Sequence, residues 1–347
     1  MRDSILVSSI RSFFIALFAM IGICAGFLPL ILIFTLLSST TSDEPESSYK
    51  QEIVANANGV RKQLSSDAPV ILKLNISGVI GTELLSMDAV RQQLIESREG
   101  DLKNDRVKAI LLTINSPGGT VIDADGIYLA IKHYKEKYKT PVFAYVDGLC
   151  ASGGMYIAAA ADMIYASEIS LVGSVGVITP TFFNFSQVLD KFNVQALTLY
   201  AGKGKDEMNP LRPWKADESD SLKGIIDYYY HNFVDIVTRD RPKLDKTKLV
   251  NDYGAHVFYA KQALEYGYID GAGFDYSQTL TLLAKQIGIE DDYYQVIEMQ
   301  SNHWFASLFK GDFSLLKGKL THQIQLVPEL DAKLMNQFLY LYRPERL

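Results

Sequence analysis

Cysteine is scarce in this chain, which has only two such residues, Cys24 and Cys150, among 347. Cys24 lies in an apolar N-terminal segment and Cys150 in a glycine-rich turn, so no structural disulfide is expected between them. A basic block is also lacking, and the net charge of −6 argues against nucleic acid as a partner. No Gly-Lys-Ser/Thr follows a glycine-rich turn, which disfavours a phosphate-binding loop. We predict neither a cofactor nor a metal site.

Charged residues and histidine are absent from residues 12–42. The apolar core, residues 13–37, is long enough to cross a hydrocarbon layer of ~30 Å as a helix, and Pro29 can kink such a helix without breaking it. We therefore predict a transmembrane anchor at 12–42. Arg2 and Arg11 precede it, which places residues 1–11 in the cytoplasm and the rest outside. The alternative is a cleaved signal peptide, because small residues follow the apolar stretch.

Beyond the anchor we predict a linker at 43–67, with a candidate helix near 49–64, a globular domain at 68–287, and a C-terminal region of unknown role at 288–347. Within the domain, an apolar strand, a glycine-rich turn and a helix occur twice in succession. The first unit covers a strand at 107–114, a turn at 115–119 and a helix at 123–138, and the second begins with a strand at 142–146. This pattern predicts an α/β fold with parallel strands and right-handed crossovers.

The second turn, Cys150-Ala151-Ser152-Gly153-Gly154, places one serine between a strand and a helix. A sharp strand-to-helix corner is the geometry of an exposed nucleophile, although the spacing is not Gly-x-Ser-x-Gly. Neighbouring parallel strands would bring the two turns side by side, so that the N–H groups of Gly119 and Gly153 could face one carbonyl oxygen. Taken alone, each turn is better explained as an ordinary connection.

A serine nucleophile needs a base, and the residues alone leave its identity open. None of the histidines sits in a motif-like setting, and His256, which precedes a predicted helix, is the best of them. Lys203 and Lys205 lie in a glycine-rich loop. A lysine whose pKa is lowered by burial can act as a base, whereas a loop lysine is ordinarily solvated.

Four motifs decide between these candidates. In chain order they are Asn115-Ser116-Pro117-Gly118-Gly119, Ala151-Ser152-Gly153-Gly154, Gly173-Ser174-Val175-Gly176-Val177 and Gly202-Lys203-Gly204-Lys205-Asp206. Together they closely resemble the signal peptide peptidase A family, the protease IV type of membrane-anchored Ser–Lys peptidase, over about residues 70–273. The resemblance implies a Clp-protease/crotonase-like fold preceded by one transmembrane helix. It also implies Ser152 as the nucleophile, Lys205 as the general base, and Gly119 and Gly153 as the oxyanion hole.

The resemblance further implies an endopeptidase of the cell inner membrane, with one membrane pass and the peptidase domain on the extracytoplasmic (periplasmic) side. Its expected substrates are signal-peptide remnants and other hydrophobic peptides, with Leu or Ala preferred at the cleavage position. The length fits the short form of the family, which is expected to form a homo-oligomeric ring that takes the lysine from the adjacent copy. Two departures, Ala201 where relatives often carry serine and Cys150 where a small residue is common, remove no catalytic group. The alternatives are a crotonase-fold acyl-CoA enzyme and a catalytically silent membrane scaffold.

Overall fold

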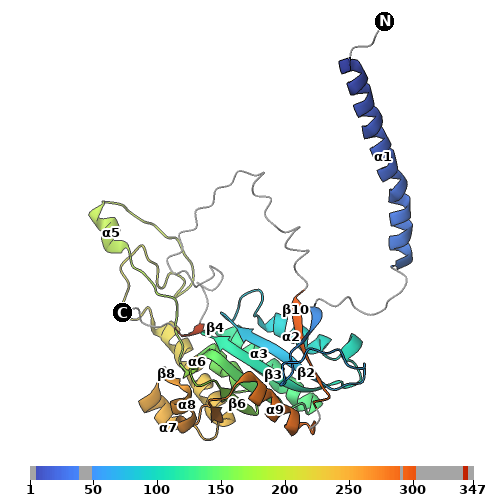
Figure 1. Cartoon of the computed structure of the whole chain (residues 1–347). Coiled ribbons are helices and arrows are strands. Elements are labelled where there is room, and N and C mark those ends of the chain that lie inside the picture. Colours follow the sequence, from blue (N-terminus) through green and yellow to red (C-terminus); the bar gives the residue numbers. More distant parts are fainter. Residues whose placement is uncertain (1–4, 39–48, 290–291, 302–338, 343–347) are drawn as a thin grey trace. The chain divides into compact units, whose positions relative to one another are not determined.

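The computed structural model describes residues 5–38, 49–289, 292–301 and 339–342, and the chain divides into two units, Met1–Ser47 and Ser48–Leu347 (Figure 1). The described part of the first unit, residues 5–38, forms the helix α1 (Ile5–Ser38), which contains Pro29. Its stretch Arg11–Pro29 is long and apolar enough to cross a membrane. The helix begins earlier than the predicted anchor, and the end of that anchor, residues 39–42, lies outside the described residues.

The second unit is built on a nine-stranded sheet whose main path has the order β1-β10-β2-β3-β5-β6-β9. The strands on this path are β1 (Tyr49–Val54), β2 (Val70–Ser77), β3 (Val107–Ser116), β5 (Val142–Ala151), β6 (Met163–Ala166), β9 (Gly271–Ala272) and β10 (Gln295–Ser301). Strand β7 (Leu171–Gly173) pairs in parallel with the C-terminal end of β5, and β8 (Val257–Tyr259) pairs antiparallel with β7. Only β1 runs antiparallel along the main path, which confirms the predicted parallel α/β pattern.

The longer helices are α2 (Met87–Glu96), α3 (Val121–Tyr138), α6 (Asp220–Asp240) and α9 (Tyr276–Gln286). Shorter helical segments are η1 (Gly100–Leu102), α4 (Gly153–Ala158), α5 (Ser186–Lys191), α7 (Lys246–Lys248), η2 (Leu249–Tyr253) and α8 (Ala260–Tyr266). Hydrogen bonds to side-chain caps fix the first residues of the longer helices α2 and α3. Ser86 accepts a hydrogen bond from the Ala89 N–H at 3.2 Å, and Thr120 accepts one from the Asp123 N–H at 3.1 Å.

Both faces of the sheet are covered, as the period-two alternation of β2 requires. Leu72 and Leu74 point into the larger core, which they share with residues of α2, α3, α4 and α6. Ile71 points to the opposite face, where Leu280 and Leu283 of α9 pack against it and its neighbours. Parallel strands buried on both faces read as nearly continuous apolar runs, which is why β3 and β5 were recognisable in the sequence.

Two stretches differ from expectation. The helix considered near residues 49–64 is wrong, because Tyr49–Val54 forms the edge strand β1, paired with β10. The C-terminal region, left without a role, supplies β10 to the sheet and a short strand β11 (Leu339–Leu341). Strand β11 pairs with β4 (Gly118–Thr120), outside the nine-stranded sheet. Both differences involve pairing between segments far apart in the chain, which local propensity does not encode.

Candidate active site

Ser152 occupies the corner between β5, which ends at Ala151, and α4, which begins at Gly153. Its backbone angles, φ 54° and ψ −118°, lie in a region that residues with a Cβ rarely adopt. Two hydrogen bonds hold it there: its N–H donates to the Gly173 carbonyl at 2.9 Å, and its carbonyl accepts from the Tyr156 N–H at 3.0 Å. Such strain persists only where surrounding structure enforces it, and it gathers at functional sites.

The two glycine-rich turns lie side by side, as the sequence predicts. Ser116 at the end of β3 pairs with Cys150 in β5, and a Cβ on Gly118 would lie 2.8 Å from the Gly153 nitrogen. The Gly118 carbonyl and the Thr120 N–H both bond to Ile80, at 2.9 and 3.1 Å. Since backbone groups alternate in direction along a strand, the N–H of Gly119 points to the other edge of β4, away from Ile80.

Close packing explains why glycine occupies this turn. A Cβ on Gly119 would lie 1.9 Å from the Ile80 carbonyl oxygen, a distance that no side chain tolerates. Gly118 has a φ of 99° and would meet backbone atoms in the same way. The absence of side chains at Gly118 and Gly119 therefore lets this backbone lie close to the Ser152 corner.

Strand β11 lies along the edge of β4 that faces away from Ile80, an arrangement that sequence reasoning missed. Tyr340 faces Gly119 in the antiparallel register, and Leu339 also bridges to Ile178, with two backbone hydrogen bonds of 3.1 Å. The alternation Leu339-Tyr340-Leu341-Tyr342 is typical of a strand and was the available signal, but it does not reveal the partner. With β11 in place, Ser152 is only 1% exposed.

Lys205 does not meet Ser152 within this chain. It is exposed, and within residues 49–289 no hydrogen bond or ion pair joins its ammonium to the Ser152 hydroxyl. His256 does not serve Ser152 either, since its ring is exposed and its Nδ1 contacts the Tyr253 carbonyl at 2.7 Å. Within the described part of the chain, neither candidate base therefore contacts Ser152.

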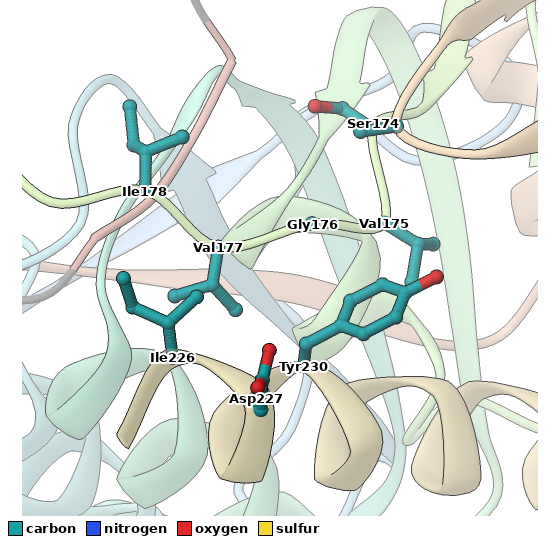
Figure 2. Close-up of a pocket in the computed structure, with 9 residues that line it drawn as sticks. Ser174, Val175, Gly176, Val177, Ile178, Ile226, Asp227 and Tyr230 are labelled. Carbon is teal, nitrogen blue, oxygen red and sulfur yellow. The ribbon is translucent and has the colours of Figure 1, made fainter. Parts of the chain in front are cut away.

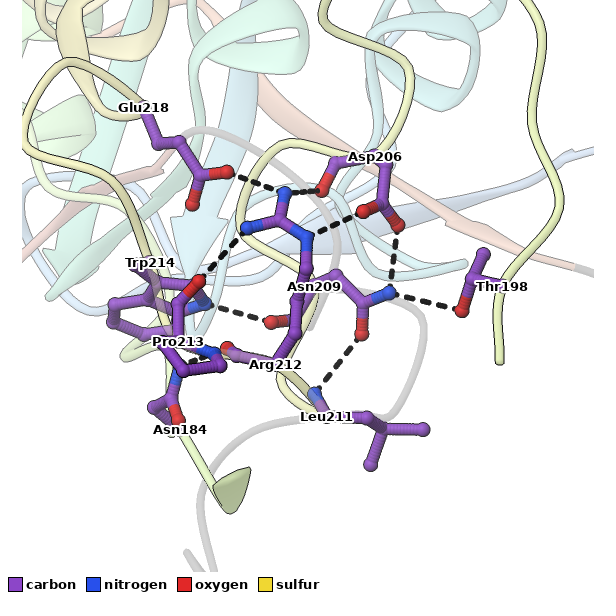
Figure 3. A network of polar contacts seen from close by, with 9 residues as sticks. All are labelled: Asn184, Thr198, Asp206, Asn209, Leu211, Arg212, Pro213, Trp214 and Glu218. Atoms are coloured by element: carbon purple, nitrogen blue, oxygen red, sulfur yellow. Dashed lines mark hydrogen bonds and ion pairs between the residues drawn. The ribbon is translucent and has the colours of Figure 1, made fainter. Parts of the chain in front are cut away.

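The residue after Lys205 is held firmly (Figure 3). Nε of Arg212 donates to the Asp206 carboxylate at 2.5 Å, Nη2 donates to the Asp206 carbonyl, and the same guanidinium pairs with Glu218. Both carboxylates are buried, and hydrogen bonds from Arg212 lower the pKa of each below its ordinary value. Lys205 therefore lies between Gly204, which has a φ of 80°, and the firmly held Asp206.

A cavity lies beside the segment that follows β7. Residues 174–178 run above α6 and enclose with it a cavity of about 380 Å³ (Figure 2). Val177 faces Ile226, the Val175 side chain lies near the Tyr230 ring, and the Ser174 hydroxyl points away from α6. This cavity offers apolar surface next to the segment that bonds to β11.

Cys150, two residues before Ser152, is an unsuitable nucleophile. It is fully buried, and burial raises the pKa of its thiol to about 12. Among the described residues no group of three His, Cys, Asp or Glu side chains is arranged to hold a metal ion. The Cys150 thiol is therefore a poor competitor for Ser152 as the candidate nucleophile.

The parallel sheet, its helical crossovers and the serine at a strand-to-helix corner define an α/β protein of the Clp protease type. The Clp protease family model matches residues 88–170. The model of peptidase family S49 matches residues 134–290. The chain is 32% identical to a provisionally named protease, slr0021, of Synechocystis, over 58% of this chain and 69% of that protein. It belongs to peptidase family S49, the family of signal peptide peptidase A, and is a serine protease by that membership.

Two further similarities accompany this assignment. A provisionally named signal peptide peptidase SppA of Enterococcus faecium is 27% identical over 84% of this chain and 87% of its own length. Among solved structures, a ClpP1 point mutant of Listeria monocytogenes is 17% identical with a TM-score of 0.39, covering 62% of this chain and 96% of that one.

Proposed function

We propose that the protein is a membrane-anchored serine endopeptidase in which Ser152 is the nucleophile and Lys205 the general base. The observation that carries the proposal is the strained backbone of Ser152 at the end of β5, next to Gly119 and Gly153. The Ser152 hydroxyl attacks a peptide carbonyl carbon while its proton passes to the Lys205 amine. The N–H groups of Gly119 and Gly153 stabilise the oxyanion. Collapse breaks the C–N bond, the lysine protonates the leaving amine, and water then hydrolyses the acyl-enzyme.

The base reaches Ser152 from a neighbouring subunit in this proposal. Lys205 is exposed, and Arg212 fixes the adjacent Asp206, so the lysine is presented at the surface of its own subunit. Packing against a neighbour would strip water from the amine, which favours its neutral, basic form. The assembly we propose is a homo-oligomeric ring, in which each Ser152 meets the lysine of the next copy.

Labelling with a fluorophosphonate, mapped by mass spectrometry, tests the nucleophile. We expect the label on Ser152, and we expect Ser152→Ala and Lys205→Ala each to abolish peptide hydrolysis, because removing one member disables a set that acts as a unit. Lys203→Ala is the matched control, two residues away in the same loop, and should remain active. An inactive Lys203→Ala with an active Lys205→Ala would reassign the base. Binding of acyl-CoA esters without labelling would instead favour a crotonase-type enzyme.

A mixing experiment tests whether the pair forms between subunits. Rings that contain both Ser152→Ala and Lys205→Ala subunits should regain part of the activity, since some sites join an intact serine to an intact lysine from the next copy. Mixed rings of confirmed composition that stay inactive would show that the pair forms within one chain.

We propose that α1 anchors this enzyme in the cell inner membrane, with the peptidase unit on the extracytoplasmic side. Its apolar length and the position of Arg11 at the start of the candidate span support this arrangement. Hydrophobic remnants of signal peptides are then the substrates within reach. A reporter fused after Ser66 should be active only outside the cytoplasm, and the mature chain should keep residues 1–42. Peptides with an acidic residue at the cleavage position should be poor substrates compared with apolar ones.

A further inference from the structure

One guanidinium holds two different oxygens of Asp206, the residue that follows Lys205 (Figure 3). Nε of Arg212 donates to the Asp206 carboxylate at 2.5 Å, and Nη2 donates to the Asp206 main-chain carbonyl at 2.5 Å. The first bond alone would leave the backbone of Asp206 free to turn, whereas the two together fix its side chain and its backbone in one orientation. Arginine suits this task because its planar group presents several N–H donors in fixed directions.

Both Asp206 and the arginine are held from a second side as well. Nη2 of the arginine also pairs with the Glu218 carboxylate. The Asp206 carboxylate accepts a further hydrogen bond from Nδ2 of Asn209 at 2.6 Å, and the same nitrogen donates to the Thr198 hydroxyl at 3.0 Å. Asp206 is therefore tied to chain that precedes the Lys205 loop and to chain that follows it.

The two carboxylates at this guanidinium are balanced by two cations. Asp206 and Glu218 are both buried. The pKa of each lies below its ordinary value, chiefly because of the hydrogen bond from Arg212 and further because of the positive charges of Arg212 and Lys215. The charged cluster thus consists of Asp206, Arg212, Lys215 and Glu218, and its charges cancel.

Lys205 directly precedes this charged cluster in the chain. The other charged side chains in its loop, Lys203 and Glu207, are exposed and opposite in sign. Loss of the Arg212 charge alone would therefore leave one negative charge in excess next to the Lys205 amine. A nearby negative charge favours the protonated form of an amine, and a protonated amine cannot take the Ser152 proton.

We propose that Arg212 is a positioning residue for the general base: it orients Lys205 through Asp206 and cancels the charge of the two carboxylates beside the amine. This proposal rests on the peptidase function proposed above and adds to it the residue that makes Lys205 competent as a base. Arg212 is assigned no contact with the reacting atoms and no proton-transfer step. It acts only through its neighbours.

The competing explanation is that Arg212 merely stabilises the fold of its own loop. Loss of the arginine would then lower kcat by one factor at every pH, because fewer sites are intact. Under the proposal, the pH at which Lys205 loses its proton also moves, in a direction that the removed charge decides. It moves up when Arg212 is neutralised and down when Glu218 is neutralised.

The first experiment records kcat and KM against pH for the assembled full-length protein and for its Arg212→Gln and Glu218→Gln variants. At neutral pH, kcat of Arg212→Gln should fall about tenfold or more, because a misplaced base transfers the proton poorly, while KM changes less than about twofold. The acidic limb of the kcat profile should shift by about half a pH unit or more, upward in Arg212→Gln and downward in Glu218→Gln. An acidic limb that stays in place in both variants would overturn the proposal.

Two control variants separate charge, geometry and stability. Arg212→Lys keeps the charge but loses the planar fork, so its kcat should fall while the acidic limb stays in place. Arg241→Gln removes another buried arginine, which follows α6 and pairs with the buried Asp270. It should lower the melting temperature and leave the acidic limb in place. A shifted limb in Arg241→Gln would show that the limb follows stability, and would contradict the proposal.

A titration without catalysis separates this proposal from the peptidase function. Reductive methylation with ¹³C-formaldehyde labels the lysines of the assembled protein, and the Lys205 signal is identified by its absence in Lys205→Arg. The pKa of Lys205 read from this signal should rise in Arg212→Gln and fall in Glu218→Gln. A pKa that is unchanged in both variants would refute the proposal even if the protein is a peptidase. If no variant hydrolyses any peptide, the peptidase function fails, and the titration still decides whether Arg212 controls the charge of Lys205.

Discussion

Replacing Ser152 by glycine should stabilise the protein while it destroys activity. The serine is held at φ 54° and ψ −118°, a conformation open to glycine but costly for a residue with a Cβ. Backbone strain of this kind costs about 1–3 kcal/mol, and the extra chain entropy of glycine takes back about 0.5–1 kcal/mol. A net gain of about 1 kcal/mol remains, which corresponds to a melting-temperature rise of about 2 °C for a domain of this size.

Ser152→Ala is the matched control, because it removes the hydroxyl and keeps the Cβ. Thermal unfolding of both variants, under identical conditions, should show a rise for Ser152→Gly only. An equal rise in both would trace the gain to loss of the hydroxyl and not to relief of strain. A fall in Ser152→Gly would refute the argument that the corner stores strain at all.

Three further predictions follow from single contacts. Gly119→Ala places a Cβ 1.9 Å from the Ile80 carbonyl and should displace an oxyanion donor, lowering kcat by about 10²-fold or more; an unchanged kcat would contradict that role. Cys150→Ala should keep its activity, and iodoacetamide should not modify the native thiol at neutral pH, because burial raises the pKa of Cys150 to about 12. Hydrogen bonds from Arg212 lower the pKa of Asp206 and Glu218 in the folded state. Their stabilising contribution is therefore complete above the ordinary carboxyl pKa and lost as pH falls through the lowered values. Hydrogen exchange of residues 201–212, corrected for its intrinsic pH dependence, should accelerate only in acid, and acceleration already at neutral pH would contradict this.

The sequence predicts the parts of this fold that local signals define. The apolar runs of β3 and β5, each followed by glycines, indicate buried parallel strands, and Ser86 marks the start of α2 through its cap. Adjacency of the two turns then follows from topology alone, and the structure places them side by side, with Gly118 next to Gly153. The assignment of Lys205 comes from the resemblance and not from the fold, and it stays a prediction.

What the sequence misses depends on long-range pairing and on backbone strain. Strand β1 pairs with β10, which lies far away along the chain, and no local sequence pattern identifies that partner. Hydrogen bonds to Gly173 and Tyr156 hold Ser152 at its positive φ. The conformational preference of serine does not predict such an angle. The same reasoning applies to Tyr340, whose burial depends on α4 and α6 together.

Under the proposed function, an isolated subunit is inactive because its nucleophile has no base. Its Lys205 is exposed, and Arg212 holds the adjacent Asp206, so the lysine is presented outward. Docking of a neighbour supplies the base and strips water from the amine, which favours the neutral form that can take the Ser152 proton. Separated subunits should therefore be inactive although Ser152 and Lys205 are both intact, and activity should return on reassembly.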